Sequence, residues 1–475
     1  MGFKGKRVTV VGLARSGAGA ANLLSGLGAD VTVTDTKTRQ QLGTFPDNLS
    51  PEVKLELGGH PVGLFENSEL IVVSPGVPMS IPPLKTASEK GIKIIGELEL
   101  AYQIITNRRR ASGPYRGESG GQQQKTEFLA VTGTNGKSTT STLLYEMLKN
   151  SGTSVLLVGN IGNALTEALL VERDALPDCF VVEVSSFQLE TIDEFRPGIS
   201  AILNITPDHL DRYHSMPDYI DAKCRVFSNQ KEGDVLILNA DDPMTGEIIK
   251  RGRRLWGSGN APAILYFSRT NKVKGAYCKD DIIYFDLPDS SLFTLHPSSF
   301  LIKGVHNMEN AMAASLMALL AGCSPDSVAR TLEIFPGLEH RLEFVREIDG
   351  VRFINDSKGT NVGAVLKSLE GFKEPVVLIA GGRDKDSDFS ELAPLVREKV
   401  KALVLIGEAR DKIKKALGDV VMTYMEDDFS AAIFRAKEIA SRGDVVLLSP
   451  ACASFDMFRD FEDRGRQFKK VVMGL

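Results

Sequence analysis

The segment FLAVTGTNGKSTTSTLLYEMLKN, residues 128–150, runs from an apolar stretch through a glycine-rich loop into a helical pattern. A strand followed by such a loop and a helix directs backbone N–H groups and the positive end of the helix dipole at one anion. In this arrangement Lys137 reaches the β- and γ-phosphates of ATP, and Ser138 reaches Mg²⁺. The sequence therefore predicts an α/β fold built around an ATP site. The residues expected at the phosphates are Gly133, Thr134, Asn135, Gly136, Lys137, Ser138 and Thr139.

The loop departs from the full phosphate-binding pattern GxxxxGK[ST]. Val131 occupies the position of the first glycine, so only the shorter form GxxGKS is present. The strand before the loop and the helix after it still supply the context that phosphate binding requires. A glycine-rich turn with an exposed lysine remains the alternative interpretation.

Short runs rich in valine and isoleucine alternate with helical patterns along the chain, which is typical of parallel sheets with crossover helices. A chain of 475 residues is too long for one ordinary core, and its length predicts about three domains. The runs ILYFSR, DIIYFDL and SLFTLHP, between residues 264 and 301, predict a small antiparallel patch. The turn FPG at residues 335–337 precedes a third alternation. We predict domains at residues 1–97, 98–337 and 338–475.

Residues 107–126, NRRRASGPYRGESGGQQQKT, differ in composition from the rest of the chain. They contain almost no apolar side chains, so they bury too little surface to offset the entropy of ordering. We predict a mobile loop or linker here, within the second domain.

Composition and charge exclude several classes of protein. A net charge of -5 and a pI near 5.9 provide no basic field for nucleic acid or an anionic membrane. The five cysteines are scattered and form no CxxC pair, which favours a reducing compartment without disulfides or a zinc site. The apolar run at the N-terminus is broken by Gly12 and Arg15, and no other run is long enough to span a bilayer. We therefore expect a cytoplasmic protein.

Two polar residues interrupt or follow apolar runs where magnesium ligands for phosphoryl transfer are expected. Glu183 lies within CFVVEVSS, where a buried strand seldom contains a carboxylate without a cationic partner. His209 follows AILNIT, at the carboxyl end of a predicted strand, where α/β proteins bind ligands. Two alternatives remain open, because Glu183 also fits an ion pair with an arginine and His209 also fits a helix cap.

The first strand is followed by GLARSGAG, and Asp35 ends the second strand near the position of a ribose-binding acid. A dehydrogenase would explain this pattern. However, Ala14 replaces the second glycine of GxGxxG and hinders close approach to a dinucleotide pyrophosphate. A loop that contains Arg15 and Ser16 and still offers N–H groups suits a different diphosphate.

Seven segments occur in order along nearly the whole chain: GTNGKST, EVSSFQLE, DHLDRY, HNMENA, EHRLE, NDSKGTN and SPACASFD. In this order they resemble the Mur ligases, and within that family the ligases that add D-glutamate to UDP-N-acetylmuramoyl-L-alanine for bacterial peptidoglycan. The resemblance implies a Rossmann-like domain that holds the UDP-sugar, a central P-loop ATPase domain, and a Rossmann-like C-terminal domain that closes over the site. The segment at 107–126 is longer and more basic than this junction usually is in the family.

The resemblance also assigns roles that spacing alone does not reveal. Lys137, Glu183 and His209 match catalytic positions. Lys223, in YIDAKCRVF, matches a lysine that the family carbamylates with CO2, which turns a cation into a carboxylate-like ligand of magnesium. The implied ligands of two Mg²⁺ ions are Ser138, Glu183, His209 and Lys223. Further implied ATP contacts are Asn307, Asn310, Arg341 and Asp356.

The substrate contacts implied by the resemblance lie in the first and third domains, with one in the second. Those for the UDP-sugar are Arg15, Ser16, Asp35, Thr36, Ser74, Pro75, Gly76 and Asn160. Those for D-glutamate are Lys358, Thr360, Lys385, Ser454 and Phe461. On sequence alone Ser454 also fits a plain helix cap after the strand VVLLSP, and Lys385 also fits a solvated loop.

The implied reaction passes through an acyl phosphate, formed when the alanyl carboxylate attacks the γ-phosphate of ATP and consumed when the amine of D-glutamate attacks it. We expect a monomer whose domains close over the site. Three other functions compete. A folylpolyglutamate synthase lacks a complete third domain at the N-terminus, a dehydrogenase leaves GTNGKST unused, and a regulatory P-loop protein leaves Lys223 and SPACAS without a role.

Overall fold

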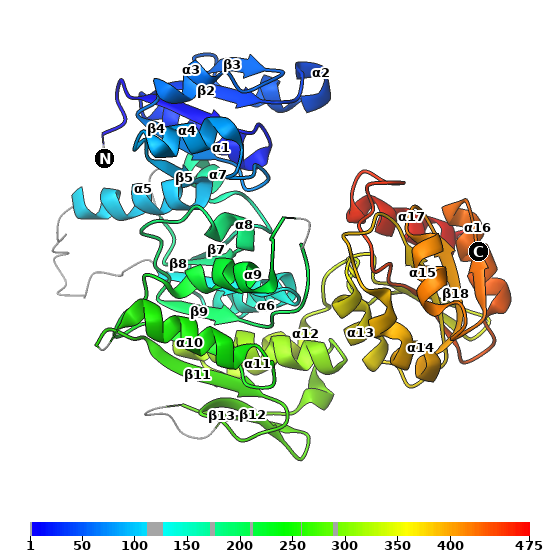
Figure 1. Ribbon diagram of the computed structural model, residues 1–475. Coiled ribbons are helices and arrows are strands. Elements are labelled where there is room, and N and C mark those ends of the chain that lie inside the picture. Colours follow the sequence, from blue (N-terminus) through cyan, green and yellow to red (C-terminus); the bar gives the residue numbers. More distant parts are fainter. Residues whose placement is uncertain (1, 112–126, 172–175, 210–211, 258, 288–292) are drawn as a thin grey trace.

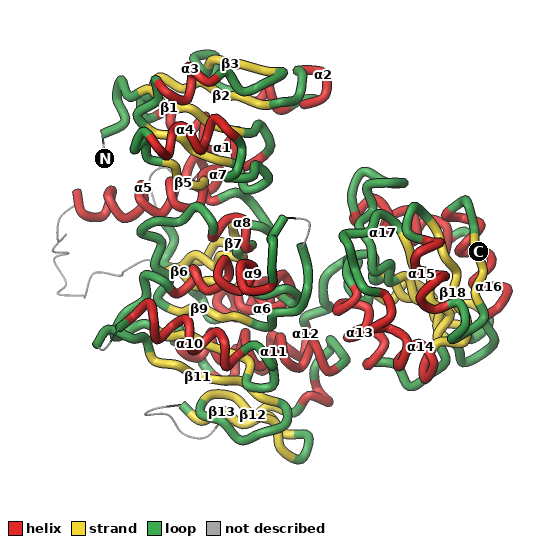
Figure 2. Tube along the Cα trace, in the orientation of Figure 1, coloured by secondary structure: helices red, strands yellow, loops and turns green. Residues whose placement is uncertain are grey.

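The computed structural model describes residues 2–111, 127–171, 176–209, 212–257, 259–287 and 293–475, with the side chains of residues 108–111 excepted. The chain forms three α/β units, each built on its own sheet (Figure 1). The N-terminal and central units are stacked, and the C-terminal unit lies to one side of them (Figure 2). The predicted α/β fold with three domains is confirmed.

The N-terminal sheet has five parallel strands in the order β3-β2-β1-β4-β5. The order reverses at β1, so the loops after β1 and β4 diverge and leave a crevice at their carboxyl ends, where such sheets bind ligands. The strands are β1 Arg7–Val11, β2 Asp30–Asp35, β3 Lys54–Leu57, β4 Leu70–Val73 and β5 Ile94–Gly96. The helices are α1 Arg15–Gly26, α2 Arg39–Leu42, α3 Val62–Glu66 and α4 Pro82–Glu89, with a 3-10 turn at Phe45–Asn48.

Helix α5, Glu97–Ala111, joins the first unit to the second. It corrects the predicted loop at 107–126, because the first five residues of that segment continue the helix, while 112–126 lie outside the described residues. Two buried carboxylates in its first turn attach it to the central unit. Glu97 accepts hydrogen bonds from the backbone and hydroxyl of Thr166, at 2.6 and 2.8 Å. Glu99 accepts three from the backbone N–H groups of residues 193–195, at 2.8 to 2.9 Å.

The central sheet has nine strands in the order β14-β13-β12-β11-β10-β9-β6-β8-β7. Pairing is parallel from β7 to β12 and antiparallel from β12 to β14. The strands are β6 Glu127–Thr132, β7 Val155–Gly159, β8 Cys179–Glu183, β9 Ile199–Ile202, β10 Val235–Asn239, β11 Ala263–Ser268, β12 Gly275–Lys279, β13 Ile282–Asp286 and β14 Phe293–Leu295. The antiparallel patch is therefore confirmed for β13 and β14. Its predicted first member, ILYFSR, is wrong, because β11 pairs in parallel with the unpredicted strand β12.

Both faces of this sheet are buried, which explains why its strands are continuous apolar runs. Phe128 and Ala130 of β6 belong to one hydrophobic cluster, and Leu129 and Val131 belong to another on the opposite face. The helices are α6 Lys137–Asn150, α7 Leu165–Val171, α8 Ser186–Leu189, α9 Met216–Cys224, α10 Thr245–Trp256, α11 Val305–Leu320 and α12 Pro325–Ile334. Two 3-10 turns lie at Arg225–Phe227 and Pro297–Ser299.

The C-terminal sheet has six strands in the order β15-β16-β20-β17-β18-β19, all parallel except β15. The strands are β15 Glu343–Ile348, β16 Val351–Asn355, β17 Val376–Gly381, β18 Val400–Ile406, β19 Thr423–Met425 and β20 Val445–Leu448. The helices are α13 Val362–Glu370, α14 Ala393–Lys399, α15 Arg410–Leu417, α16 Phe429–Ile439 and α17 Phe461–Met473, with a 3-10 turn at Phe389–Leu392. The predicted boundaries lie at the start of α5 and between α12 and β15, and they remain predictions.

The hydrophobic clusters show which of the three units share a core. One cluster contains Val8 and Leu24 of the N-terminal unit, Ile105 of α5, and Phe128 and Leu169 of the central unit. The two clusters of the C-terminal unit contain no residue of the other units. The first two units therefore share a core, whereas the third has its own.

Candidate functional site

The loop between β6 and α6 has the backbone that phosphate binding requires. Gly133 and Gly136 have φ values of 147° and 84°, a region that side chains rarely adopt. A Cβ at residue 136 would lie 2.3 Å from Oδ1 of Asn310 in α11. Asn204 holds the loop from the other side, because its Oδ1 accepts a hydrogen bond from Asn135 N at 2.8 Å and its backbone O accepts one from Thr134 N at 2.9 Å.

The ammonium of Lys137 lies over this loop. It donates to the carbonyls of Gly133 and Thr134, at 2.9 and 2.8 Å. Burial lowers the pKa of Lys137, and the nearby carboxylates of Glu183 and Asp208 act in the opposite direction. The lysine is therefore folded back onto the loop and available to a phosphate placed there.

Arg341 reaches the same loop from the start of the C-terminal unit. Its Nη2 donates to Oγ of Ser138 at 2.6 Å, across 203 residues of sequence. The neighbours of Arg341 on either side, His340 and Leu342, have φ values of 63° and 46°, so this short stretch of backbone is strained. Burial lowers the pKa of Arg341, and Glu183 opposes that shift.

Glu183, at the end of β8, is 1% exposed. Its Oε1 accepts a hydrogen bond from Asn160 at 2.6 Å, while its buried Oε2 has no hydrogen-bond partner among the described residues. The carboxylate opposes the lowering of the pKa values of Lys137, Arg341 and Lys358, so it lies close enough to interact electrostatically with all three. A buried carboxylate oxygen without a partner, beside a phosphate loop, fits a ligand of Mg²⁺.

The predicted metal ligands do not form a complete cage. Within the described ranges, no group of three His, Cys, Asp or Glu side chains is placed to hold a metal ion. Mg²⁺ usually keeps several waters and binds through one or two carboxylates and the phosphates of a substrate. Glu183 with Ser138 fits that kind of site, and phosphates would supply further oxygens.

Lys223, in α9, is 1% exposed and lies beneath the loop. Its Nζ donates to the carbonyl of Gly133 at 2.8 Å and lies 4.6 Å from the ring centre of Tyr219. Burial lowers the pKa of Lys223 well below its ordinary value, and the charge of Lys137 lowers it further. The sequence pattern missed Tyr219, whose hydroxyl lies 3.2 Å from Oγ1 of Thr134.

His209 has a positive φ of 56° and lies beside Asp208, a residue that the sequence analysis did not select. The backbone N–H of His209 donates to Asp208 Oδ1 at 2.9 Å, and Nε2 of the His209 ring is 3.7 Å from Asp208 Oδ2. Two residues of the C-terminal unit meet the same carboxylate, Asn361 at 3.0 Å and Lys385 at 3.5 Å. Burial alone would raise the pKa of Asp208, but the charge of Lys385 and the other partners hold it below its usual value. The signal that could have found Asp208 is its position after a strand and next to His209.

Four of the predicted D-glutamate residues lie in loops after β16, β17 and β20, at the carboxyl edge of the C-terminal sheet, and the fifth, Phe461, begins α17. Nζ of Lys358 lies 3.7 Å from the ring centre of Phe461. Burial, assisted by Arg341, lowers the pKa of Lys358 to about 7. The backbone N–H of Thr360 donates to the carbonyl of Lys358 at 2.8 Å, which fixes this loop. Ser454 is buried after β20.

Asp356, a predicted nucleotide contact, is bound mainly within its own unit. Its Oδ2 accepts hydrogen bonds from the hydroxyls of Ser449 and Ser368, at 2.7 and 2.8 Å. Burial raises its pKa to about 6, although these hydrogen bonds and Arg341 oppose that shift. The carboxylate therefore organises the loop that carries Lys358.

The predicted UDP-sugar residues of the N-terminal unit lie at the carboxyl ends of β1, β2 and β4. Asp35 accepts hydrogen bonds from the N–H groups of Leu13 and Lys37, at 2.7 and 2.8 Å. Oγ of Ser74 donates to the carbonyl of Gly12 at 2.8 Å. The remaining predicted residues of this unit, in the same loops or at the start of α1, are Arg15, Ser16, Thr36, Pro75 and Gly76.

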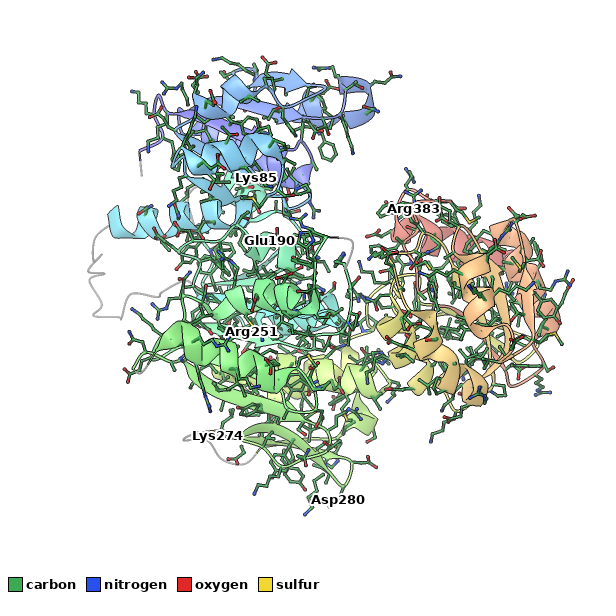
Figure 3. All side chains as sticks on the ribbon, in the orientation of Figure 1. Lys85, Glu190, Arg251, Lys274, Asp280 and Arg383 are labelled. Atoms are coloured by element: carbon green, nitrogen blue, oxygen red, sulfur yellow. The ribbon has the colours of Figure 1, made fainter. Side chains whose placement is uncertain are left out.

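Arg212 connects this crevice to the central unit. It donates to the carbonyls of Pro75 and Val77, at 3.1 and 3.5 Å, and to the carboxylate of Glu190 at 2.6 Å. Glu190 lies in the central unit, at the end nearest the N-terminal unit (Figure 3). Neither Arg212 nor Glu190 was selected from the sequence.

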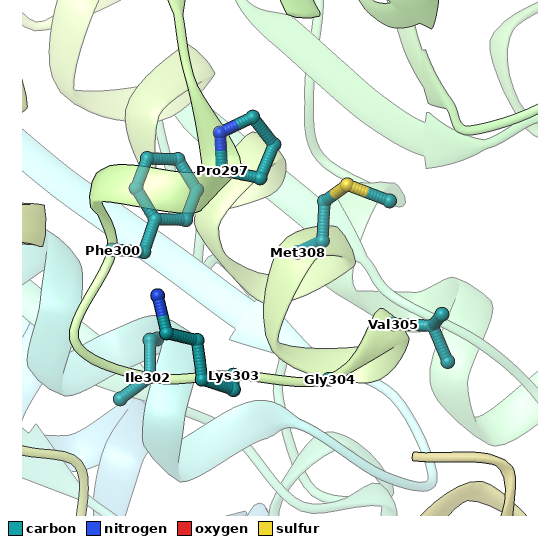
Figure 4. Close-up of a pocket in the computed structure, with 7 residues that line it drawn as sticks. All are labelled: Pro297, Phe300, Ile302, Lys303, Gly304, Val305 and Met308. Carbon is teal, nitrogen blue, oxygen red and sulfur yellow. The ribbon is translucent and has the colours of Figure 1, made fainter. Parts of the chain in front are cut away.

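The first turn of α11 borders a cavity of about 250 Å³ (Figure 4). The lining residues are Pro297, Phe300, Ile302, Lys303, Gly304, Val305 and Met308. Asn307 lies on the same turn of helix and donates to the carbonyl of Lys303 at 2.9 Å. Asn310, three residues on, donates to Asn307 Oδ1 at 3.3 Å and accepts from Thr140 at 3.2 Å. The two predicted adenine-side residues thus form a row from the cavity to the phosphate loop.

The charges of the site are unbalanced in favour of cations. The charge of Arg341 lowers the pKa values of Lys137 and Lys358, and Glu183 opposes the lowering at all three cations. Other carboxylates act on one or two of these cations, but burying neighbouring cations is unfavourable unless anions compensate their charge. The site therefore suits a polyphosphate together with substrates that carry carboxylates.

Three family models match the chain in succession. They are "Mur ligase MurD-like, N-terminal domain" over residues 6–96, "Mur ligase middle domain" over 131–318, and "Mur ligase, glutamate ligase domain" over 340–452. Among curated proteins, UDP-N-acetylmuramoylalanine--D-glutamate ligase of Geotalea daltonii is 44% identical over 100% of this chain and 99% of its own length. The protein of the same name from Pelotomaculum thermopropionicum is 43% identical over 100% and 98%.

Solved structures share the fold at much lower identity. UDP-N-acetylmuramate-alanine ligase MurC from Thermotoga maritima has a TM-score of 0.58 and 18% identity, with 99% of each chain covered. MurF ligase from Thermotoga maritima, in complex with ADP, has a TM-score of 0.59 and 16% identity, with 94% of this chain and 95% of that chain covered. Within the described residues, none of the helices combines the length and apolar character needed to cross a bilayer.

Proposed function

The chain belongs to the Mur ligase family, and from that membership we propose that it is the ATP-dependent ligase that joins D-glutamate to UDP-N-acetylmuramoyl-L-alanine in peptidoglycan synthesis. The observation that carries this proposal is the junction at Ser138. Arg341, from the unit that matches the glutamate ligase model, there meets the phosphate loop of the central unit. A site for a phosphate and a site for an amino acid are thereby joined.

The reaction has two steps in which atoms and charges balance. The alanyl carboxylate attacks the γ-phosphate of ATP to give an acyl phosphate and ADP, and the D-glutamate amine then attacks the acyl carbon to give an amide, phosphate and a proton. Phosphate leaves a carbonyl carbon more easily than an oxide ion does, so two moderate barriers replace one high barrier.

Lys137 and Arg341 are proposed to stabilise the transferring phosphoryl group. Both lie at the phosphate loop, and both are held there by hydrogen bonds before any ligand arrives. Preorganised cations in a buried site lower the free energy of the charge that develops in the transition state. His209, whose ring Nε2 lies 3.7 Å from Oδ2 of Asp208, is proposed to position the acyl phosphate.

Glu183, Ser138 and His209 are the proposed ligands of Mg²⁺ among the unmodified side chains. When bound, the ion would neutralise charge on the β- and γ-phosphates. The partnerless oxygen of Glu183 is the feature of this chain that supports the assignment. Asn307 and Asn310 are proposed to hold the adenine side of ATP, and Asp356 to act on the nucleotide through its loop.

Lys223 is proposed to carry a carbamate and to hold a second Mg²⁺. A neutral amine adds CO2 to give a carbamate and a proton, so a lysine must first lose its charge. The lowered pKa of Lys223 favours that neutral amine. Its position beneath Gly133 would place the new carboxylate-like group next to the phosphate loop.

D-Glutamate is proposed to bind to Lys358, Thr360, Lys385, Ser454 and Phe461, which lie along the carboxyl edge of the C-terminal sheet. The UDP-sugar is proposed to lie in the crevice of the N-terminal unit, against Asp35, Ser74 and the start of α1, with Asn160 near its reactive end. These assignments place the alanyl carboxylate near Glu183, because Asn160 and Glu183 are hydrogen bonded.

The test is release of phosphate from ATP in the presence of UDP-N-acetylmuramoyl-L-alanine while the amino acid is varied. We expect D-glutamate to support turnover and L-glutamate, L-lysine and meso-diaminopimelate to give little. Equal turnover with any of the other amino acids would contradict the assignment. A folate substrate in place of the UDP-sugar should give no phosphate.

We also propose that the enzyme works in the cytoplasm as a monomer. Its substrates are soluble nucleotides and amino acids, and the C-terminal unit must remain free to move against the others. Light scattering of the purified protein at working concentration checks the mass, and a dimer at all concentrations would contradict this part of the proposal.

A further inference from the structure

Arg464, in the first turn of α17, is among the largest fully buried side chains of the protein and is 1% exposed. Its guanidinium donates to two neighbouring segments. Nε and Nη2 bind Oγ and the carbonyl of Ser357, at 3.0 and 2.8 Å. Nη1 and Nη2 bind the carbonyl of Cys452, at 3.3 and 3.2 Å, and Nη1 reaches the carbonyl of Ala453 at 3.5 Å.

These acceptors directly precede proposed D-glutamate residues. Ser357 precedes Lys358, and Ala453 precedes Ser454. Ala453 also exchanges two backbone hydrogen bonds with Arg383, each 2.9 Å long, two residues before Lys385. Through these bonds one guanidinium holds the loops after β16 and β20 directly and the loop after β17 through Ala453.

The same side chain is connected to Phe461 indirectly, through the hydroxyl of Ser357. Phe461 begins α17, one turn before Arg464, and its carbonyl accepts a hydrogen bond from Oγ of Ser357 at 2.8 Å. Nζ of Lys358 lies over the Phe461 ring. Arg464 is thus connected by hydrogen bonds, directly or through one further residue, to all of the segments proposed to bind the amino acid.

The charge of Arg464 is not neutralised by an ion pair with any described carboxylate. Its donors all go to carbonyl and hydroxyl oxygens. Burying a cation of this kind destabilises the folded state, whereas an apolar side chain of similar volume would leave the protein equally or more stable. The planar, five-donor head of arginine is suited to bridging several acceptors at once, and lysine cannot reproduce it.

We propose that Arg464 is a positioning residue for the amino-acid substrate, which it serves by holding the three loops that carry Lys358, Lys385 and Ser454 in one arrangement behind a dicarboxylate. This inference rests on the proposed ligase function. It predicts that loss of the guanidinium affects binding of D-glutamate far more than it affects the use of ATP or the UDP-sugar.

The experiment compares Arg464→Met and Arg464→Lys with the full-length wild type. In Arg464→Met we expect the KM for D-glutamate to rise on the order of 100-fold, the scale of losing hydrogen bonds to a charged group. Arg464→Lys keeps the charge and should recover part of this loss. The KM for UDP-N-acetylmuramoyl-L-alanine should stay within a factor of about two of wild type, since its contacts lie in other units. The KM for ATP should change far less than the KM for D-glutamate, because Arg341 and Asp356 are its only proposed contacts in the C-terminal unit and neither is hydrogen bonded to Arg464.

A partial reaction separates positioning from general damage. Hydroxylamine traps an acyl phosphate as a hydroxamate without D-glutamate, and the Arg464 variants should form it at rates close to wild type. Arg466→Met is the matched control, because Arg466 is exposed on the same helix and should leave all KM values unchanged. If Arg464→Met does not fold, Ser357→Ala removes the Nε acceptor and should raise the KM for D-glutamate alone.

The outcomes distinguish the two hypotheses. The proposed function would be contradicted if the wild type formed no hydroxamate and also released no phosphate from ATP when D-glutamate was added. The role of Arg464 would be overturned if the wild type were active and the Arg464 variants had KM values that were unchanged, or that rose equally for all three substrates.

Discussion

Lys358 should make D-glutamate binding dependent on pH near neutrality. Burial and Arg341 lower its pKa from 10.5 to about 7, so the ammonium is charged below that pH and neutral above it. A dicarboxylate binds the charged form, so the dissociation constant should rise with pH above 7, by close to tenfold per pH unit at the limit. Binding should also take up a proton. Calorimetry with D-glutamate, on enzyme without the anionic nucleotides that would raise the pKa of Lys358, measures both effects.

Lys358→Arg is the control for this pH dependence, because a guanidinium stays charged throughout the range. Its affinity should change little between pH 6.5 and 8.5. Equal affinity of the wild type at these two values would show that Lys358 does not titrate there.

Lys223→Ala should remove the proposed carbamate and lower turnover by at least about 100-fold, the scale of damage to a metal site. Acetate or formate at millimolar concentration should restore part of the activity by occupying the vacated position. Bicarbonate should have no such effect on the variant. Lys231→Ala, at an exposed lysine on the following segment, should behave as wild type. Unchanged activity of Lys223→Ala would rule out the carbamate.

Single residues were predictable where a motif or a strand end marked them. Lys137 follows from the phosphate loop and Glu183 from a carboxylate within an apolar strand. Ser454 fitted a plain helix cap on sequence alone and was selected through the family resemblance. Asn204 and Arg464 were missed, because the first looks like a loop residue and the second like a surface cation on an amphipathic helix. Only tertiary contacts reveal that they hold loops in place.

At the scale of elements, the phosphate loop depends on residue 136 having no side chain. Gly136→Ala combines a disfavoured φ of 84° with a Cβ 2.3 Å from Asn310 Oδ1. The loop must shift, so we expect ATP binding to weaken on the order of 100-fold or more, as when the geometry of a site is displaced. Titration with a fluorescent ATP analogue measures it.

Gly246→Ala is the comparison for the loop variant. Gly246 lies in α10, and nothing lies within 4 Å of the Cβ that would be added. It should bind ATP normally and keep its unfolding free energy within about 1 kcal/mol of wild type, since alanine favours helices. If both glycine variants bound ATP equally well, the prediction that a Cβ at residue 136 disturbs the phosphate loop would be wrong.

Many of the strands that the sequence indicated are buried on both faces, although β14, which was also predicted, lies at a sheet edge. β6, β8, β17 and β20 are continuous apolar runs, and they were recognised. The missed strands lie at or near sheet edges, where partial exposure permits polar and charged side chains. KLEL of β3, EFVREI of β15 and TYM of β19 contain no such run.

At the scale of the whole molecule, we expect the C-terminal unit to be the part that moves. Its cores are separate from the others, and the described contacts at the site are polar ones to Ser138, Asn135 and Asp208. Bringing Lys358 and Arg341 closer to Lys137 without anions is opposed by like charge. We expect ATP analogue and UDP-sugar together to draw the unit inward and to reduce the radius of gyration in small-angle scattering.

Either ligand alone should produce a smaller change, because only together do they bring anions to the carboxyl edges of more than one sheet. Identical scattering curves with no ligand and with both would contradict closure. The Glu97 and Glu99 contacts predict that the N-terminal and central units keep their relative placement throughout.

The number of units was predictable from length and from the alternation of patterns, but their arrangement was not. The contact between Arg341 and Ser138 spans 203 residues. No local pattern records such a distance, and only the family resemblance implied that the third domain meets the phosphate loop.

Because Arg341 joins two units at one site, a single inhibitor could bind both of them. The phosphate loop and the loop of Lys358 belong to separately folded bodies, so a molecule that carries a phosphonate for one and a dicarboxylate for the other would attach to both. Once its first end is bound, the second end is presented at a high effective concentration set by the linker. Such a tethered ligand would gain affinity through avidity while fixing the mobile body in place.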